Sequence, residues 1–184
     1  MKHNNLFYQA GCLFRLGSTT LVVIALLALV KHFVFDILPL SGVSMYPTYH
    51  DRDTYILNKI SYVTGQPHRG DVVVLRFPGD PERARYIKRL IGLPGEHLAI
   101  KDGKVFINDE LLSESYIADD MITEGFNYPD ITLGTDQYYL VGDNRPLSSD
   151  SRTWGTASKS DFIGKVFYIV WPFNRARPIP SPVY

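Results

Sequence analysis

Two serines, Ser41 and Ser44, stand in the stretch SGVSMYPT at residues 41–48, which contains no acid, base or histidine. A serine oxygen is a weak nucleophile until a neighbouring base takes its proton. Either serine could therefore perform acyl transfer only if the fold brings a base to it from another part of the chain. The alternative is that both hydroxyls merely stabilise a turn.

Histidine is the commonest base beside a catalytic serine, but the histidines of this chain form no recognisable site. His50 stands six residues after Ser44, yet GxSxG is absent and no acid is marked to orient the ring. No two of the five histidines have metal-ligand spacing, and the single cysteine, Cys12, excludes a cysteine-based zinc cluster. Phosphate-binding glycine loops are also absent. We therefore expect no metal and no other cofactor.

Lysine is the other candidate base, and one stands in RYIKRLIGLPGE at residues 85–96. Side chains alternate between the faces of a strand, so Tyr86, Lys88 and Leu90 would share one face. If that face is buried, desolvation lowers the pKa of Lys88 from about 10.4, and the amine can accept a proton near neutral pH. The alternative is that Lys88 extends to solvent at a sheet edge beside Arg89.

A third polar stretch, GDNRPLSSDSRTWG, occupies residues 142–155 after a predicted strand. Its first residues, Gly-Asp-Asn, are typical of a turn. Asp150 and Arg152 are spaced so that their side chains could pair, and the several hydroxyls could form hydrogen bonds within the loop. Taken alone, this pattern indicates a polar loop that satisfies its own hydrogen bonds.

These three segments follow a long apolar run, GSTTLVVIALLALVKHFVF at residues 17–35. As a helix it would span roughly 28 Å, close to the hydrocarbon thickness of a bilayer. Because Leu21–Val30 is apolar on every face, a buried core helix is disfavoured. A cleaved signal peptide is a second alternative, but no small-x-small site follows the run. Lys2 and Arg15 precede it and Asp36 follows it, which favours an N-terminus inside the cell.

Beyond residue 40, short runs of β-branched and aromatic residues alternate with turns, which predicts strands over 54–59, 71–77, 84–93, 137–142 and 164–171. Asp102-Gly103 and the stretch INDELL indicate two tight turns. We predict a mainly β fold: one N-terminal transmembrane helix followed by an all-β catalytic domain of short antiparallel strands. The expected organisation is a cytoplasmic segment at 1–16, an anchor at 17–37 and an extracytoplasmic domain at 38–184, with a surface excursion at 113–136. A formal net charge of zero gives no support for a nucleic-acid partner.

Taken together, the segments resemble those of the bacterial type I signal peptidases, membrane-bound serine endopeptidases that remove signal peptides. Four stretches match the boxes of that family in order, and the apolar run stands where the family has an anchor. The matching stretches are GVSMYPT (42–48), RGDVVVLRFP (69–78), YIKRLIGLPGE (86–96) and GDNRPLSSDSRTWG (142–155).

The resemblance implies a role for each matching residue. Ser44 matches the nucleophile, with its own backbone N–H in the oxyanion hole, and Lys88 matches the general base. Three further roles support these two: a serine that orients the lysine, a position where a side chain would crowd the lysine, and an acid–base pair that braces the loop. The residues in these supporting roles are, in that order, Ser148, Gly142, and Asp150 with Arg152. Ser41 is expected to be a turn residue.

The chain departs from the family pattern at Gly42. Some members have a serine there, two residues before the nucleophile, and its hydroxyl helps to hold the oxyanion. The oxyanion hole of this chain is therefore expected to rest mainly on backbone N–H groups. Whether another side chain replaces the missing donor stays open at this point.

The resemblance implies that the protein cleaves exported preproteins after small residues at −1 and −3. Its expected place is the plasma (inner) membrane, crossed once, with the catalytic domain outside the cytoplasm. The implied partners are preproteins, the lipid bilayer and, by proximity, the secretion translocon. Three alternatives remain: an organellar inner-membrane peptidase of the same family, a non-enzymatic anchored β-domain, and a Ser–Lys protease that processes itself.

Overall fold

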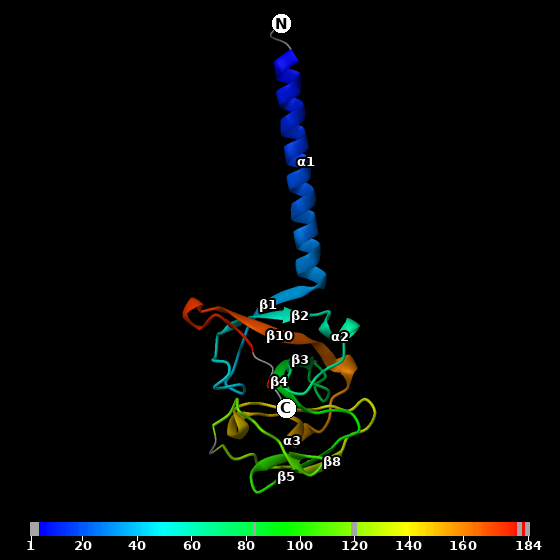
Figure 1. The fold of residues 1–184 in the computed structure, drawn as a ribbon, viewed down its shortest axis with the longest axis vertical. Coiled ribbons are helices and arrows are strands. Elements are labelled where there is room, and N and C mark those ends of the chain that lie inside the picture. The colour runs from blue at the N-terminus through cyan, green and yellow to red at the C-terminus, as the bar shows by residue number, and fades with distance from the viewer. Residues whose placement is uncertain (1–3, 83, 119–120, 180–181, 183–184) are drawn as a thin grey trace. The chain divides into compact units, whose positions relative to one another are not determined.

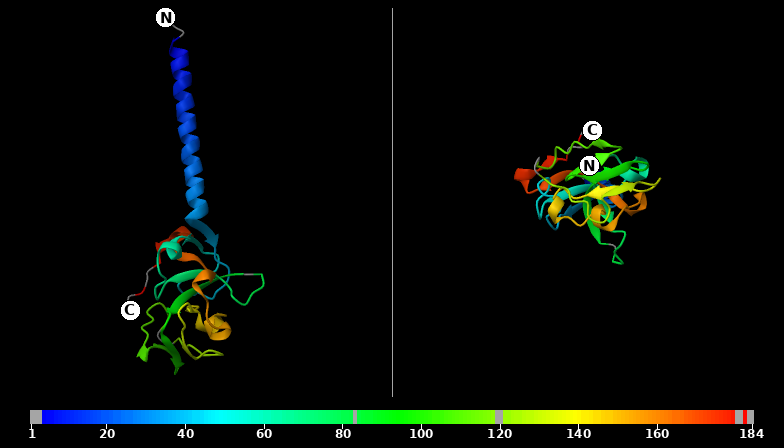
Figure 2. Two further views of the ribbon diagram at one scale, coloured as in Figure 1. Left: turned by 90° about the vertical axis from the view of Figure 1, so that its right-hand side faces the viewer. Right: turned by 90° about the horizontal axis from the view of Figure 1, so that it is seen from below.

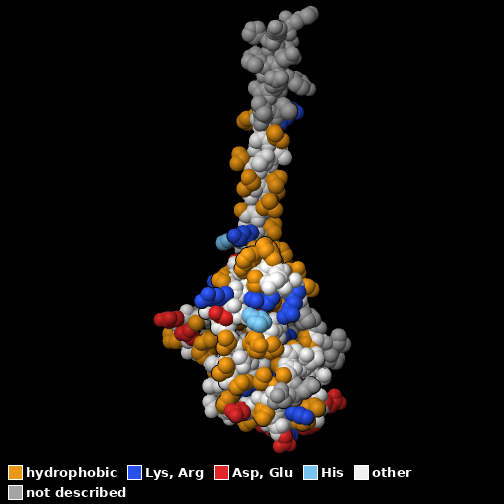
Figure 3. All heavy atoms as spheres, turned by 90° about the vertical axis from the view of Figure 1, so that its left-hand side faces the viewer, with side chains coloured by type: hydrophobic (Ala, Val, Ile, Leu, Met, Phe, Trp, Pro, Cys, Tyr) orange, Lys and Arg blue, Asp and Glu red, His pale blue; other side chains and the backbone are white. Residues whose placement is uncertain are grey.

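The computed structural model describes residues 4–82, 84–118, 121–179 and 182, and these fall into two compact units, residues 1–35 and 36–184. The first unit is the helix α1 (Asn4–Phe33). Its segment Phe14–Phe33 is long and apolar enough to cross a membrane, and its side chains are exposed. Hydrophobic side chains cover this segment (Figure 3), and Lys31 and His32 lie in the last turn. The helix ends before the C-terminal boundary predicted for the anchor at residue 37.

The second unit contains two antiparallel sheets: β1, β2 and β10 of the larger one lie at one end of the unit, and β5 and β8 of the smaller one lie at the other (Figure 1), in agreement with the second view (Figure 2). The larger sheet has the strand order β1-β2-β10-β3-β4-β9, and β11 pairs with β10. Its strands are β1 (Phe35–Pro39), β2 (Thr54–Asn58), β3 (Val72–Arg76), β4 (Arg85–Gly92), β9 (Tyr139–Val141), β10 (Phe162–Trp171) and β11 (Arg177–Pro178).

The smaller sheet has the order β7-β6-β5-β8. Its strands are β5 (His97–Lys101), β6 (Lys104–Ile107), β7 (Glu110–Leu111) and β8 (Asp130–Thr132). Asp102 and Gly103 both have positive φ, at 51° and 75°, in the turn between β5 and β6. Asn108 and Asp109 do the same between β6 and β7. Both tight turns predicted from the sequence are therefore present, with the backbone that type I′ turns require.

Short helices connect these strands: α2 (Ser61–Thr64), α3 (Ser151–Trp154), and the 3₁₀ helices η1 (Arg145–Leu147), η2 (Lys159–Asp161) and η3 (Phe173–Arg175). The central strands β3 and β4 of the larger sheet are buried on both faces over most of their length. Along β3, Val72 and Val74 pack into one hydrophobic cluster while Val73 and Leu75 pack into another. A third cluster joins β4 and β9 to the smaller sheet through Ile91, Leu98 and Tyr139, among others.

The predicted fold class, a mainly β antiparallel domain after one apolar helix, is confirmed. The five strand predictions correspond to β2, β3, β4, β9 and β10. Segment 113–136, expected as a surface excursion, is largely exposed but supplies β8 to the smaller sheet and buries Thr123 and Leu133. These contacts tie the segment to the rest of the domain.

Candidate active site

Ser44 lies in a tight turn between β1 and β2. The turn is closed by backbone hydrogen bonds from Tyr46 N to Val43 O and from Tyr49 N to Met45 O, at 3.1 and 2.9 Å. Met45 and Tyr49 are fully buried in the cluster beneath the larger sheet. Because the next side chain is anchored in the core, Ser44 is held at the surface of the domain and remains partly exposed.

The amine of Lys88 meets this serine across 44 residues of sequence: Nζ of Lys88 lies 2.8 Å from Oγ of Ser44. Lys88 is on β4, directly opposite Val73 of β3. Only 2% of the residue is exposed. The sequence alternative, in which Lys88 extends to solvent, is therefore wrong. Its neighbour Arg89 is equally buried, because both faces of β4 are covered from Ile87 onward.

Burial lowers the pKa of Lys88 from its usual value to about 8. Desolvation is the largest cause, because a charged ammonium loses its hydration in this site. The carboxylates of Asp150 and Asp143 oppose the shift, and the guanidinium of Arg152 adds to it. A substantial fraction of Lys88 is therefore neutral, and able to accept a proton, at mildly alkaline pH.

The loop at 142–155 is held by the buried pair Asp150 and Arg152. Nε of Arg152 lies 2.8 Å from Oδ1 of Asp150, and both side chains are fully buried. Oδ2 of Asp150 also accepts a 3.0 Å hydrogen bond from the backbone N–H of Gly142. Arg152 donates to the carbonyl of Arg145 at 2.7 Å. The Asp150–Arg152 pair therefore fixes the loop by binding backbone groups at Gly142 and Arg145.

Gly142 and Ser148 face each other within this loop. A Cβ atom at position 142 would come far inside van der Waals distance of Ser148 Oγ and of the Ser44 carbonyl oxygen. Only glycine fits there. A side chain at position 142 would first meet these two atoms rather than Lys88, the residue that the family resemblance implied it would crowd. Oγ of Ser148 is buried and makes no hydrogen bond within the part of the chain that the structure describes. Its orienting role toward Lys88 therefore stays a prediction.

Two residues beside the site, Arg89 and Asp143, were given no role from the sequence. The carboxylate of Asp143 receives two hydrogen bonds from Arg89, at 2.8 and 2.7 Å, and a third from the hydroxyl of Thr48. This cluster fastens the serine turn and β4 to the loop. From the sequence, Asp143 could not be distinguished from an ordinary turn residue. The one available signal was Arg89, directly after Lys88 in a predicted buried strand, because a buried arginine needs an acidic partner.

The histidines take other contacts. The backbone N–H of His50 donates to the Asp53 carboxylate, and its ring packs edge-on against Tyr46. His97 pairs with Asp130 on the smaller sheet. Among the described residues no hydrogen bond joins a histidine to Ser44, so the structure gives no support to a histidine triad. His3 lies outside the described residues.

A pocket of ≈ 260 Å³ opens beside Ser44 and Lys88. Its walls come from two extended segments, one at the end of β1 and one on β4, and from Tyr55 and Val74 behind them. The apolar wall residues include Leu38, Leu40, Tyr86 and Ile87. A paired serine and lysine at the edge of a pocket with extended walls is an arrangement suited to acyl transfer on an extended chain.

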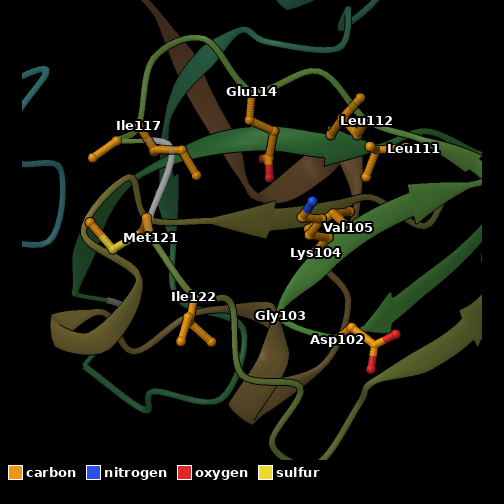
Figure 4. A pocket seen from close by; sticks show the side chains of 11 residues that line it. Asp102, Gly103, Lys104, Val105, Leu111, Leu112, Glu114, Ile117, Met121 and Ile122 are labelled. Carbon is orange, nitrogen blue, oxygen red and sulfur yellow. The ribbon is translucent and has the colours of Figure 1, made fainter.

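A second hollow, of ≈ 360 Å³, lies on the smaller sheet, where Val105, Met121 and Ile122 line it (Figure 4). Glu114, also on its wall, pairs with Arg145 at 2.5 Å, and Nε of Arg145 donates to the carbonyl of Gly142. The hollow is therefore connected to the loop of the site, although it contains none of the predicted site residues.

Residues 13–171 match the family model described as "Signal peptidase, peptidase S26". A probable signal peptidase I-2 from Synechocystis is 35% identical over 87% of this chain and 74% of its own length. Signal peptidase I of Bacillus amyloliquefaciens is 33% identical over 88% of this chain and 86% of its own. A solved signal peptidase I from Enterococcus faecalis aligns with 54% of this chain and 96% of its own, at 30% identity and a TM-score of 0.45.

The protein is thus a serine endopeptidase with an N-terminal apolar helix suited to membrane anchoring. It belongs to the signal peptidase family, peptidase S26. The resemblance stated from the sequence is confirmed, and the alternative of a non-enzymatic scaffold is not favoured.

Proposed function

We propose that this protein cleaves signal peptides from exported preproteins with a Ser44–Lys88 dyad. The observation that carries the proposal is the 2.8 Å separation of Lys88 Nζ from Ser44 Oγ, in a site where burial lowers the pKa of the lysine to about 8. Geometry and protonation together meet the requirements for a general base.

In the proposed mechanism neutral Lys88 takes the proton of Ser44 as the hydroxyl oxygen attacks the scissile carbonyl. The resulting ammonium then gives that proton to the leaving amine, which yields an acyl-enzyme and a free mature chain. Neutral Lys88 next removes a proton from water, and the hydroxide attacks the acyl carbon. When the ester bond breaks, Ser44 Oγ recovers its proton from Lys88, so the cycle closes without another reactant.

The supporting residues keep this geometry. Asp150 and Arg152 hold the loop, and Gly142 lets Ser148 and the Ser44 carbonyl approach each other. We propose that Ser148, whose hydroxyl has no partner among the described residues, turns its buried oxygen to Lys88 during the reaction. In this way the loop supplies positioning groups while Ser44 and Lys88 perform the chemistry.

The substrate segment is proposed to bind in an extended conformation between the two walls of the pocket. Residues 89–92 of β4 pair with β9, whereas residues 85–88 pair only with β3 in the described register. That leaves one edge of the β4 segment available to hydrogen-bond an added strand. The small side chains that the family resemblance implies at −1 and −3 would pack against apolar residues of this pocket such as Leu38, Leu40 and Ile87.

The apolar helix is proposed to cross the plasma (inner) membrane once, with residues 1–16 in the cytoplasm and the β domain outside. Arg15 lies in the first turn of the span Phe14–Phe33 and Asp36 follows the span, which supports this orientation by the positive-inside rule. Such an anchor would tether the β domain to the lipid bilayer, in the same membrane as the secretion translocon from which signal peptides emerge. An organellar inner-membrane peptidase would use the same arrangement.

Cleavage of a preprotein by the detergent-solubilised full chain tests this function. With alanine at −1 we expect one new N-terminus, identified by mass spectrometry. Replacing that alanine with leucine should lower kcat/KM at least about 100-fold, because the resemblance to the family implies that only small side chains are accepted at −1, whereas the same change at +2 should have little effect. Cleavage that tolerates leucine at −1 would contradict the proposed specificity.

A further inference from the structure

The peptide unit between Val43 and Ser44 has an unusual pattern of hydrogen bonds. Its carbonyl oxygen, on Val43, accepts two: one from Tyr46 N at 3.1 Å and one from Nδ2 of Asn144 at 3.0 Å. Its N–H, on Ser44, donates to no group among the described residues. One end of this peptide is therefore fully engaged while the other is available.

Asn144 holds the turn at a second point as well. Its backbone N–H donates to the carbonyl of Ser44 at 3.0 Å. The residue is only 8% exposed and lies 101 positions from Val43 in sequence. Asn144 therefore contacts the carbonyls on both sides of the serine, one through its side chain and one through its backbone.

The side-chain contact has a consequence for the free N–H. A peptide unit is planar, so a donor that fixes the direction of the carbonyl also fixes the direction of the N–H. A hydrogen bond to the carbonyl also polarises the unit and strengthens its N–H as a donor. Both effects make the N–H of Ser44 a better binding group for a negative oxygen.

The chain depends on this N–H more than a relative with a serine at position 42 would. Gly42 has no side-chain donor, and its φ of +103° is one that side-chain-bearing residues rarely adopt. Its own N–H is already bound to the carboxylate of Asp51 at 2.9 Å. Gly42 therefore offers the oxyanion neither a hydroxyl nor a free backbone donor.

We propose that Asn144 is the positioning residue of the oxyanion hole: its side-chain amide holds the Val43–Ser44 peptide so that the Ser44 N–H faces the developing oxyanion. The proposal rests on the proposed function, because an oxyanion forms only if Ser44 attacks a carbonyl. Asn144 itself touches no reacting atom in this scheme.

The test compares Asn144→Ala with Asn127→Ala in the full chain, on the pH-independent plateau of activity. Asn127 makes the same kind of bond, Nδ2 to a backbone carbonyl at 3.0 Å, but to Thr153. Removing an oxyanion donor outright lowers kcat about 10²–10³-fold. Because the N–H remains in Asn144→Ala but is less well held, we expect kcat to fall about 10- to 100-fold with KM within about twofold.

Ligand binding separates positioning from a general structural effect. A peptide aldehyde ending in alanine forms a tetrahedral adduct with Ser44 and places an oxyanion in the hole, whereas the corresponding product peptide does not. Asn144→Ala should weaken the aldehyde at least about tenfold and the product peptide less than about twofold, and Asn127→Ala should change neither. Asn144→Leu, which keeps the approximate side-chain shape and loses the donor without adding a charge, should behave like Asn144→Ala and serves if the alanine variant does not fold.

Two other outcomes have distinct meanings. If the Asn144 variants lose aldehyde and product affinity in parallel, or match Asn127→Ala in kcat, the positioning role is wrong while the proposed function stands. If the wild-type protein forms no adduct with the aldehyde and cleaves no preprotein, the proposed function itself fails and the inference fails with it.

Discussion

Replacing Ser44 with alanine is expected to abolish preprotein cleavage, with kcat lowered by about 10⁴- to 10⁶-fold, as for other serine nucleophiles. The hydroxyl oxygen of Ser44 accepts a 2.8 Å hydrogen bond from Lys88, and alanine removes this oxygen and with it the nucleophile. The buried side chain of Met45, which anchors the turn, is unchanged. The change in stability should therefore be small. Cleavage of a preprotein, followed by gel and mass spectrometry, measures the effect.

Ser41→Ala is the matched control, because it deletes the same atom three residues earlier in the same exposed segment. We expect this variant to keep activity within about threefold of the wild type. If Ser41→Ala loses cleavage and Ser44→Ala retains it, the nucleophile has been assigned to the wrong serine.

Replacing Lys88 with methionine is expected to remove cleavage and to make the protein more stable. Methionine has nearly the same length but cannot take a proton, so kcat should fall by at least about 10⁴-fold. The gain in stability follows from burial: desolvation lowers the pKa of Lys88 to about 8, and each pKa unit corresponds to about 1.4 kcal/mol. The free energy of unfolding of the variant should be higher by about 3 kcal/mol at pH 7.

This gain should depend on pH in a defined direction. Between pH 8 and about 10.5 the folded protein binds fewer protons than the unfolded chain, because only the folded pKa of Lys88 is lowered. The destabilising contribution of the wild-type lysine is complete below pH 8 and fades as the pH rises to 10.5. The advantage of Lys88→Met over wild type should fade in the same window.

Thermal or urea unfolding of the full chain in detergent measures this difference. Lys101→Met is the matched control, since Lys101 is exposed and its nearest carboxylate oxygen is 4.0 Å away. It should change stability by less than about 0.5 kcal/mol. A Lys88→Met protein that is less stable than wild type at pH 7 would contradict the burial argument, and one that still cleaves would contradict the assignment of the base.

Local sequence signals predicted most of the fold. Strands β2, β3 and β10 contain runs of β-branched and aromatic residues, and the turns at 102–103 and 108–109 carry the Asp and Asn residues that tolerate positive φ. The apolar run was long enough to predict its helix without tertiary information. Each of these signals is contained within about twenty residues of the chain.

Two features of the site lay beyond local signals. The alternation of side chains on β4 could not distinguish a buried Lys88 from a buried Arg89, because both faces of the strand are covered. Only the ordered resemblance to a family favoured the lysine. The contacts from Asn144 to Val43 and from Thr48 to Asp143 join residues 101 and 95 positions apart, and no spacing rule connects such residues.

The departure at Gly42, which the sequence left open, is clearer in the structure. Gly42 adopts a positive φ, and its N–H is bound to Asp51, so it supplies no donor to the oxyanion. The structure instead shows a peptide at Ser44 whose carbonyl is held from the loop by Asn144. Under the proposal above, no side chain replaces the missing donor at Gly42; instead, Asn144 holds the backbone N–H of Ser44 in position.

The pH dependence of kcat/KM for the wild-type protein tests the central claim, a dyad with Lys88 as base, most directly. Because the neutral amine is the active form, kcat/KM should rise with pH with a slope of one, reach half its maximum at a pKa of about 8, and level off above it. A limb with its midpoint near 6.5, as expected for a histidine, or a profile that is flat from pH 6 to 10, would contradict the account.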